Sequence, residues 1–283
     1  MIEVSHLSKA YGTRQALADV SFTLEKGKVY GFLGVNGAGK STTMNIMTGC
    51  LSPTSGTVTV NGISMAEEPE KAKRFIGYLP ELPPVYPDMT VEEYLFFVAE
   101  LKGIPKGMRK AEVERVAEET HLTAVRERLI RNLSKGYQQR TGLAQAILNH
   151  PEIMILDEPT VGMDPQQILE VRRLIAGLRA EHIVILSSHI LSEISAVCDE
   201  ILILANGRLV ARGSEEELTA GDGSGELHIT LHAKDGVTEE KIGRLLADAG
   251  ITVTDMHRKK ETLEEVFLRV TGGMRNDGEE TAV

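Results

Sequence analysis

The spacing of hydrophobic and polar residues along the chain predicts an α/β fold. Residues 2–9 and 20–24 alternate between apolar and polar side chains, as strands with one exposed face do. The run Ile153-Met154-Ile155-Leu156 is apolar on both faces, which is typical of a central strand in a parallel sheet. Further strands are predicted at the apolar runs 29–33, 76–79, 183–186 and 201–204.

Helical spacing and capping signals predict the helices. Thr90 and Glu93 form a capping box at the start of a helix whose apolar face continues to Leu101. Residues 90 to about 150 show helical patterns almost throughout, so an all-α insertion is predicted there. Later helices are predicted at 165–179, from residue 190, and after Ser214.

Turn residues divide these elements. Asn61-Gly62 and Asn206-Gly207 each predict a β-hairpin. The segment 80–87 contains four prolines and is predicted to be an ordered, extended loop. The glycine-rich stretch 220–225 is predicted to be a linker.

The linker predicts two domains. Residues 1–220 form the larger one, with a β-rich N-terminal subdomain and the helical insertion. Residues 226–271 are predicted to be a small C-terminal α+β appendage, and 272–283 an acidic, flexible tail. Within the appendage, strands are predicted at 227–232 and 251–257 and helices at 238–249 and 262–270.

Composition narrows the classes of function. The net charge of −10 disfavours nucleic acid as a main partner, because phosphate neutralisation needs clustered lysine and arginine. Cys50 and Cys198 lie far apart in apolar sequence, so both are expected to be buried free thiols in a reducing compartment. No secretion signal and no run of 18 apolar residues is found, so the chain is expected neither to be secreted nor to span a membrane. His228 and His232 would share one strand face, and a solvated face is favoured over a metal site.

The most informative motif is a glycine-rich stretch between the strand at 29–33 and a following helix. Its three glycines let the backbone curl so that N–H groups point at phosphate oxygens, and the helix N-terminus adds positive partial charge. Lys40 supplies a cation for the β- and γ-phosphates, and the Ser41 hydroxyl is placed to bind a nucleotide-borne Mg²⁺. The residues predicted to hold the nucleotide in this phosphate-binding loop are Gly34, Asn36, Gly37, Ala38, Gly39, Lys40, Ser41 and Thr42.

Two acidic residues and one aromatic extend the candidate site. Asp157 and Glu158 end a buried strand at the sheet edge where the phosphate-binding loop also lies. Asp157 is predicted to hold Mg²⁺ through water, and Glu158 to polarise the water that attacks the γ-phosphate. Tyr11 precedes the loop, and its position fits equally a ring that stacks on the nucleotide base and a half-buried residue at a strand end.

The order of the motifs resembles the ATP-binding subunit of an ABC transporter. Leu133-Ser134-Lys135-Gly136-Tyr137 precedes Asp157-Glu158-Pro159-Thr160, and Gly162-Met163-Asp164 and Ser187-Ser188-His189 follow. The similarity covers residues 2 to about 213. It implies an ABC ATP-binding domain with a P-loop NTPase core over residues 1–220, ATP and Mg²⁺ as ligands, and ATP hydrolysis coupled to transport.

The resemblance also implies roles for single residues. By this resemblance residues 133–137 are the signature loop. Its Ser134 and Gly136 would bind the γ-phosphate of ATP held by another subunit. Asp164 would contact that subunit, and His189 would be the catalytic switch histidine that senses the γ-phosphate. Tyr11 would be the aromatic residue that stacks on adenine.

Three residues depart from the usual family pattern. Lys135 and Tyr137 replace glycine and glutamine in the signature loop, and because a lysine beside a phosphate is electrostatically acceptable, ATP-bound dimers are expected to form. Glu81 stands where the family commonly has a glutamine that contacts Mg²⁺ and the transmembrane partner, so it is a third predicted metal ligand beside Ser41 and Asp157. With the proline-rich loop, this variant resembles the ATPases of bacterial type-2 exporters for antibiotics, sodium or gliding-motility components.

Partners follow from the same resemblance. It implies a separate transmembrane permease subunit, a homodimer or heterodimer of ATP-binding subunits, and a cytoplasmic location on the inner face of the cell membrane. The alternatives are a soluble ABC ATPase of translation or DNA repair and a P-loop kinase. The chain shows neither the tandem nucleotide domains usual in the translation type nor the long coiled coils of the repair type, and a kinase has no need of a signature loop.

Overall fold

The computed structural model describes residues 1–219 and 239–250 of the chain. Tertiary contacts divide the chain into two units, Met1–Ala220 and Gly221–Val283. The elements that carry the candidate site all lie in the first unit.

In the second unit the structure describes helix α9 (Glu239–Asp248), which matches the helix predicted at 238–249. The other predicted elements of the appendage and the predicted tail lie outside the described residues, as do His228 and His232. The boundaries 226–271 and 272–283 therefore stay predictions.

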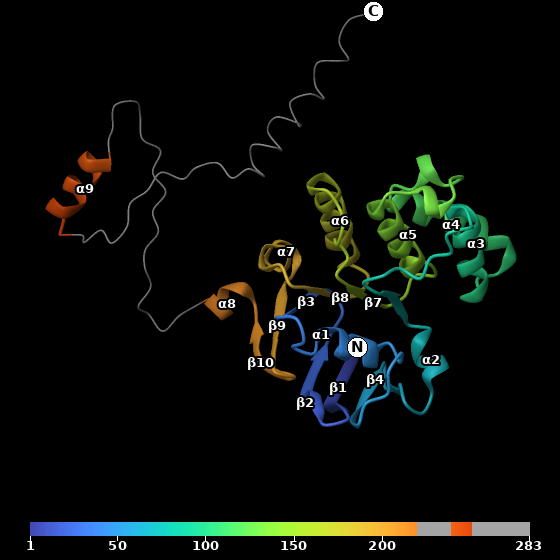
Figure 1. Ribbon diagram of the computed structural model, residues 1–283, viewed down its shortest axis with the longest axis horizontal. Coiled ribbons are helices and arrows are strands. Elements are labelled where there is room, and N and C mark those ends of the chain that lie inside the picture. The colour runs from blue at the N-terminus through green and yellow to red at the C-terminus, as the bar shows by residue number, and fades with distance from the viewer. Residues whose placement is uncertain (220–238, 251–283) are drawn as a thin grey trace, which may run out of the picture. The chain divides into compact units, whose positions relative to one another are not determined.

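A six-stranded sheet forms the centre of the first unit (Figure 1). Its order is β10-β9-β3-β8-β7-β6, and all neighbouring strands are parallel except β10 and β9. β7 and β8 are buried along their whole length, which confirms the prediction of a central parallel sheet. The strands are β3 (Val29–Leu33), β6 (Ile76–Leu79), β7 (Ile153–Asp157), β8 (Ile183–Ser188), β9 (Glu200–Ala205) and β10 (Arg208–Gly213).

A second, antiparallel sheet of order β2-β1-β4-β5 forms the predicted β-rich N-terminal part. β2 begins at Arg14 rather than at Val20, because Arg14 pairs with Tyr11 directly across a tight turn. Both Asn-Gly hairpins are confirmed, since Asn61-Gly62 and Asn206-Gly207 have positive φ and join antiparallel strands. The strands are β1 (Ile2–Tyr11), β2 (Arg14–Leu24), β4 (Ser55–Val60) and β5 (Ile63–Ser64).

The predicted helical insertion is present between β6 and β7. Thr90 and Glu93 form the expected capping box, in which the Glu93 N–H donates to the Thr90 hydroxyl and the Thr90 N–H donates to the Glu93 carboxylate. The insertion consists of α3 (Val91–Leu101), α4 (Lys106–Glu119), the short 3₁₀ helices η1 (Thr123–Val125) and η2 (Ile130–Asn132), and α5 (Lys135–Ile147).

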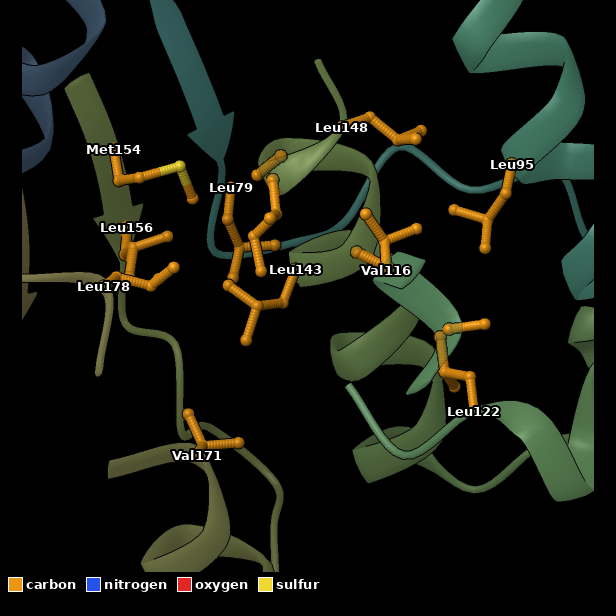
Figure 2. Packing of buried hydrophobic residues seen from close by; sticks show 14 of the residues in the cluster. Leu79, Leu95, Val116, Leu122, Leu143, Leu148, Met154, Leu156, Val171 and Leu178 are labelled. Atoms are coloured by element: carbon orange, nitrogen blue, oxygen red, sulfur yellow. The ribbon is translucent and has the colours of Figure 1, made fainter. Parts of the chain in front are cut away.

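Alternate residues of the central strands enter two separate cores. Met154 and Leu156 of β7 join the core formed with α3, α4, α5 and α6, where Figure 2 shows them near Leu79. Ile153 and Ile155 face the opposite side and join the core formed with α1 and the antiparallel sheet. Each face of β7 is therefore covered, which explains the continuous apolar run in its sequence.

Of the remaining helices of the first unit, four connect strands and the fifth follows the last strand, β10. Ser214 caps the last of them, as predicted, by accepting from the N–H of Glu217. Within the described ranges, no helix is long and apolar enough to cross a membrane. These helices are α1 (Lys40–Met47), α2 (Pro69–Lys73), α6 (Pro165–Leu178), α7 (Leu191–Val197) and α8 (Glu215–Thr219).

The prediction that both cysteines are buried is wrong for Cys50. Cys50 lies just after α1, and its side chain is exposed. Its backbone N–H donates to the Asn45 carbonyl in the last turn of the helix, which holds the residue at the surface. Cys198 is half-buried beside Gly31, and burial raises the pKa of its thiol to about 12. Cys198 is therefore a thiol of low reactivity.

Lys102 joins the end of α3 to the end of α5. Its Nζ donates to the backbone carbonyls of Gln145 at 2.7 Å, Ala146 at 3.1 Å and Leu148 at 2.9 Å. Burial lowers the pKa of this lysine to about 8. Two of these carbonyls belong to the last turn of a helix and the third to the residue that follows it, where no backbone donor is positioned to satisfy them.

We expect Lys102→Met to lower the free energy of unfolding by about 1–3 kcal/mol, because it removes the hydrogen-bond donor of these three carbonyls. Urea unfolding followed by circular dichroism measures the loss. Lys106→Met, at an exposed position nearby, is the matched control and should be neutral. Equal stability of the Lys102→Met and Lys106→Met proteins would show that Lys102 does not hold the two helices together.

Candidate functional site

The glycine-rich loop joins β3 to α1, in the strand–loop–helix context that the sequence predicts. Gly37 and Gly39 have φ angles of 82° and 111°, a region that favours glycine. A Cβ on Gly39 would lie 2.6 Å from Cδ2 of Leu17, so the packing of the loop also excludes a side chain there. Gly39 precedes the first turn of α1 and no side chain caps that turn, which leaves its N–H groups free to bind an anion.

Lys40 lies at the start of α1 and is 6% exposed. Its Nζ donates to the carbonyl of Gly34 at 2.6 Å and approaches that of Val35 at 3.4 Å. The ammonium is therefore held over the loop. Ala38 is buried, and its N–H donates to the Val35 carbonyl, which tightens the turn.

A cavity of about 420 Å³ opens beside this loop. Its volume lies in the usual range for small-ligand sites. It brings together residues from β1, β2, the loop, α1 and the ends of β6, β7 and β8. The lining residues are Tyr11, Arg14, Ala16, Asn36, Gly37, Gly39, Lys40, Ser41, Thr42, Glu81, Glu158, Val161 and His189.

Asp157 lies behind the cavity rather than on its surface. It is 4% exposed, and its Oδ1 accepts hydrogen bonds from the hydroxyls of Ser41, at 3.5 Å, and Ser187. A carboxylate and a hydroxyl side by side are oxygen ligands that suit Mg²⁺, which commonly takes one or two protein ligands and completes its shell with phosphates and water. No group of three or more acidic, histidine or cysteine ligands occurs among the described residues. Ser41 and Asp157 thus fit a metal that arrives with the nucleotide.

Glu158 and His189 face each other across the ends of β7 and β8. Glu158 has a φ of 52°, so the chain turns sharply after the strand. Its N–H donates to the Ser187 hydroxyl at 3.1 Å, and both of its carboxylate oxygens lie 3.0 Å from Nδ1 of His189. Because both side chains line the cavity, the pair is placed to take a proton from a water and to orient it.

Tyr11 and Glu81 stand at the rim of the cavity. Tyr11 is 50% exposed at the end of β1, and Nζ of Lys9 lies 5.4 Å from the centre of its ring. Glu81 is exposed and follows β6 and Pro80. Both predicted positions are therefore accessible to a ligand in the cavity.

The signature-loop residues lie outside the cavity lining. Ser134 is exposed and caps α5 by accepting from the N–H of Tyr137. Gly136 is buried against α6, where a Cβ would lie 2.1 Å from Oε1 of Gln167. Asp164 is exposed and caps α6 in the same way, through the N–H of Gln167. The resemblance assigns Ser134 and Gly136 to ATP held by another subunit and Asp164 to the contact with that subunit, and none of the three lines the chain's own cavity. Of the residues predicted to hold the chain's own nucleotide, Gly34 and Ala38 are also absent from the lining.

Arg14, Ala16 and Val161 line the cavity but are absent from the sequence-based set. Arg14 adds a guanidinium near the glycine loop, where its Nη2 would lie 3.3 Å from a Cβ added to Gly37. The signal that could have found it is a basic residue directly across the turn from Tyr11. Val161 is 42% exposed.

Fold and site together define a P-loop protein that binds a nucleotide. Residues 17–161 match the ABC transporter family. The uncharacterized ABC transporter ATP-binding protein YxlF of Bacillus subtilis is 34% identical, over 95% of this chain and 99% of that protein. The bacitracin transport ATP-binding protein BcrA of Bacillus licheniformis is 32% identical, over 96% of this chain and 98% of that protein.

A solved structure of the ATP-binding subunit of an ABC transporter also resembles this chain. It is 32% identical, superposes with a TM-score of 0.71, and the alignment covers 77% of this chain and 91% of the other. The chain belongs to the ABC transporter family. It is an ATP-binding and ATP-hydrolysing subunit of that family.

Proposed function

We propose that this chain powers an exporter through ATP-driven closure of a head-to-tail pair of copies of itself. One observation carries the proposal: the cavity holds Lys40, Glu158 and His189 but neither Ser134 nor Gly136. Ser134 is instead exposed at a helix N-terminus, where it can meet the γ-phosphate in the cavity of a second copy. In a two-fold pair, each copy then supplies what the other lacks.

The chain's own residues divide the work at each site. The loop N–H groups and Lys40 bind the phosphates, while Tyr11 stacks on adenine. Glu158 takes a proton from the attacking water, and His189 orients Glu158 and contacts the γ-phosphate. Mg²⁺ would be held near Ser41 and Asp157, and it supplies charge neutralisation of the phosphates when bound.

We place the pair on the inner face of the cell membrane, bound to a separate permease. BcrA, described as a bacitracin transport ATP-binding protein, is aligned along nearly the whole chain and supports a transport role. The permease supplies the path for the cargo, so the cargo class is a property of that partner. ATP binding would favour the closed pair because the complete phosphate site exists only there.

Glu81 is proposed to link the ATP site to the permease and to be a ligand near Mg²⁺. It lines the cavity, and the loop that follows packs firmly on the helical insertion. Pro83 lies so close to Gly142 of α5 that a Cβ there would approach it to 2.6 Å, and the Tyr94 hydroxyl donates to the Pro84 carbonyl at 3.2 Å. A displacement at Glu81 can therefore reach α3 and α5.

We expect Glu81→Gln to keep ATPase activity within a few-fold, because an amide oxygen still serves the metal. Glu81→Ala should reduce transport more than hydrolysis, because it removes the contact that couples them. ATPase rate and export are measured together in vesicles that contain the permease. Unchanged export in Glu81→Ala would remove Glu81 from the coupling mechanism, and ATP-independent export by the wild-type complex would contradict the proposed function.

A further inference from the structure

Glu193 of α7 is a buried carboxylate outside the cavity. It is 7% exposed and does not line the cavity. Its Oε1 accepts from the Thr160 hydroxyl at 2.8 Å, and its Oε2 accepts from the Ser188 hydroxyl at 2.7 Å. No ion pair of the described part of the chain includes it. A buried carboxylate is costly unless its oxygens are bonded, so these two hydroxyls account for its placement.

The two hydroxyl partners of Glu193 lie close in sequence to Glu158 and His189, one after β7 and one at the end of β8. Thr160 lies two residues after Glu158, and Ser188 directly precedes His189. Since Glu158 in turn contacts His189, chain and side-chain bonds form a closed ring through Glu158, Thr160, Glu193, Ser188 and His189. The ring fixes the distance between the two turns that present the reactive side chains to the cavity.

The ring requires that both terminal atoms of the side chain at position 193 accept a hydrogen bond, one from Thr160 and one from Ser188. Ser188 Oγ already accepts from the N–H of Ile190 at 3.0 Å, so its own proton must be donated, and Glu193 receives it. Thr160 is buried and likewise donates. A carboxylate is acceptor-only and serves both hydroxyls, whereas an amide would present two N–H donors to one of them.

We propose that Glu193 is a positioning residue that aligns Glu158 with His189 by holding Thr160 and Ser188 at a fixed separation. The inference rests on the proposed roles of Glu158 and His189. Because Glu193 touches neither the loop nor the cavity, its role lies in the hydrolytic step and not in nucleotide binding. Thr160 belongs to the segment that leads to Asp164, and Ser188 belongs to the turn that carries His189. A displacement of the Asp164 segment when two copies pair would therefore reach the His189 turn through Glu193.

The test compares wild type with Glu193→Gln, Thr160→Val and the double variant. ATPase kcat and KM are measured, with the Kd for the fluorescent analogue TNP-ATP and the thermal unfolding midpoint. We expect Glu193→Gln to lower kcat by about tenfold to a hundredfold, as small displacements of catalytic groups do, with KM and the Kd for TNP-ATP within about twofold of wild type. Ser192→Ala, at an exposed position of the same helix, is the matched control and should change nothing.

Thr160→Val removes one bond of the ring and keeps the volume, so it tests the ring if Glu193→Gln folds poorly. We expect it to lower kcat less than Glu193→Gln does, and the double variant to be no slower than Glu193→Gln, because both act on one ring. Wild-type kcat in both single variants would overturn the proposal, as would a fall in kcat matched by equal losses in TNP-ATP affinity and unfolding midpoint. Glu158→Gln in the same assay separates the two claims: if that variant stays active, the proposed general base is wrong, whereas an inactive Glu158→Gln beside a fully active Glu193→Gln overturns only the role of Glu193.

Discussion

The Glu158→Gln variant is expected to hydrolyse ATP about 10²–10⁴-fold more slowly than wild type, because it removes the general base. The amide has nearly the same shape, and its oxygen can still meet Nδ1 of His189, but it cannot accept the proton of the attacking water. The phosphate cradle on the loop before α1 is untouched. ATP affinity should therefore stay within a few-fold.

Steady-state phosphate release and equilibrium binding of ATP measure these two quantities. The matched control is Glu181→Gln, which makes the same change at an exposed glutamate in the turn before β8 and should have wild-type activity. Hydrolysis by Glu158→Gln within about threefold of wild type, well short of the usual general-base effect, would show that another group is the base.

Mixing two inactive variants is expected to restore activity. Lys40→Ala removes the phosphate cation from a chain's own cavity, and Ser134→Arg blocks the γ-phosphate contact that the chain offers to its partner. A mixed pair keeps one intact composite site, built from the cavity of the Ser134→Arg chain and the signature loop of the Lys40→Ala chain. With random pairing at equal amounts, about a quarter of the wild-type rate should return if the sites act independently.

The control for this experiment is Lys40→Ala mixed with the double variant Lys40→Ala, Ser134→Arg, because no pair in that mixture has an intact site. Ser134 also caps α5, so Ser134→Arg is first checked for a normal unfolding midpoint. No recovery at any mixing ratio, with both variants folded, would contradict sites shared between copies.

Much of the fold follows from local signals in the sequence. The capping box of Thr90 and Glu93, the Asn-Gly hairpins and the glycine loop each occur where they are predicted, because the residues that decide them are close in sequence. The extended start of β2 is different. Arg14 lies in the strand because it pairs with Tyr11, a fact of the register that alternation alone does not reveal.

The site is only partly predictable for the same reason. Glu158 and His189 come together because β7 and β8 are neighbours, with Asp157 opposite Ser187 in the sheet. The order β3-β8-β7 is a tertiary property, so the sequence singles out both residues through their motifs without predicting their contact. Glu193 carries no motif signal of its own. Only its two hydroxyl partners, Ser188 close in sequence and Thr160 far from it, distinguish it from an ordinary helical glutamate.

The solution mass of Glu158→Gln, measured by light scattering during size-exclusion chromatography, tests the central claim most directly. The ATP-bound pair should accumulate in this variant because it binds ATP and does not consume it. We predict the mass of one chain without nucleotide and of two chains with Mg-ATP, and no such change when Lys40→Ala is added. A single-chain mass while ATP is demonstrably bound would contradict ATP-driven pairing.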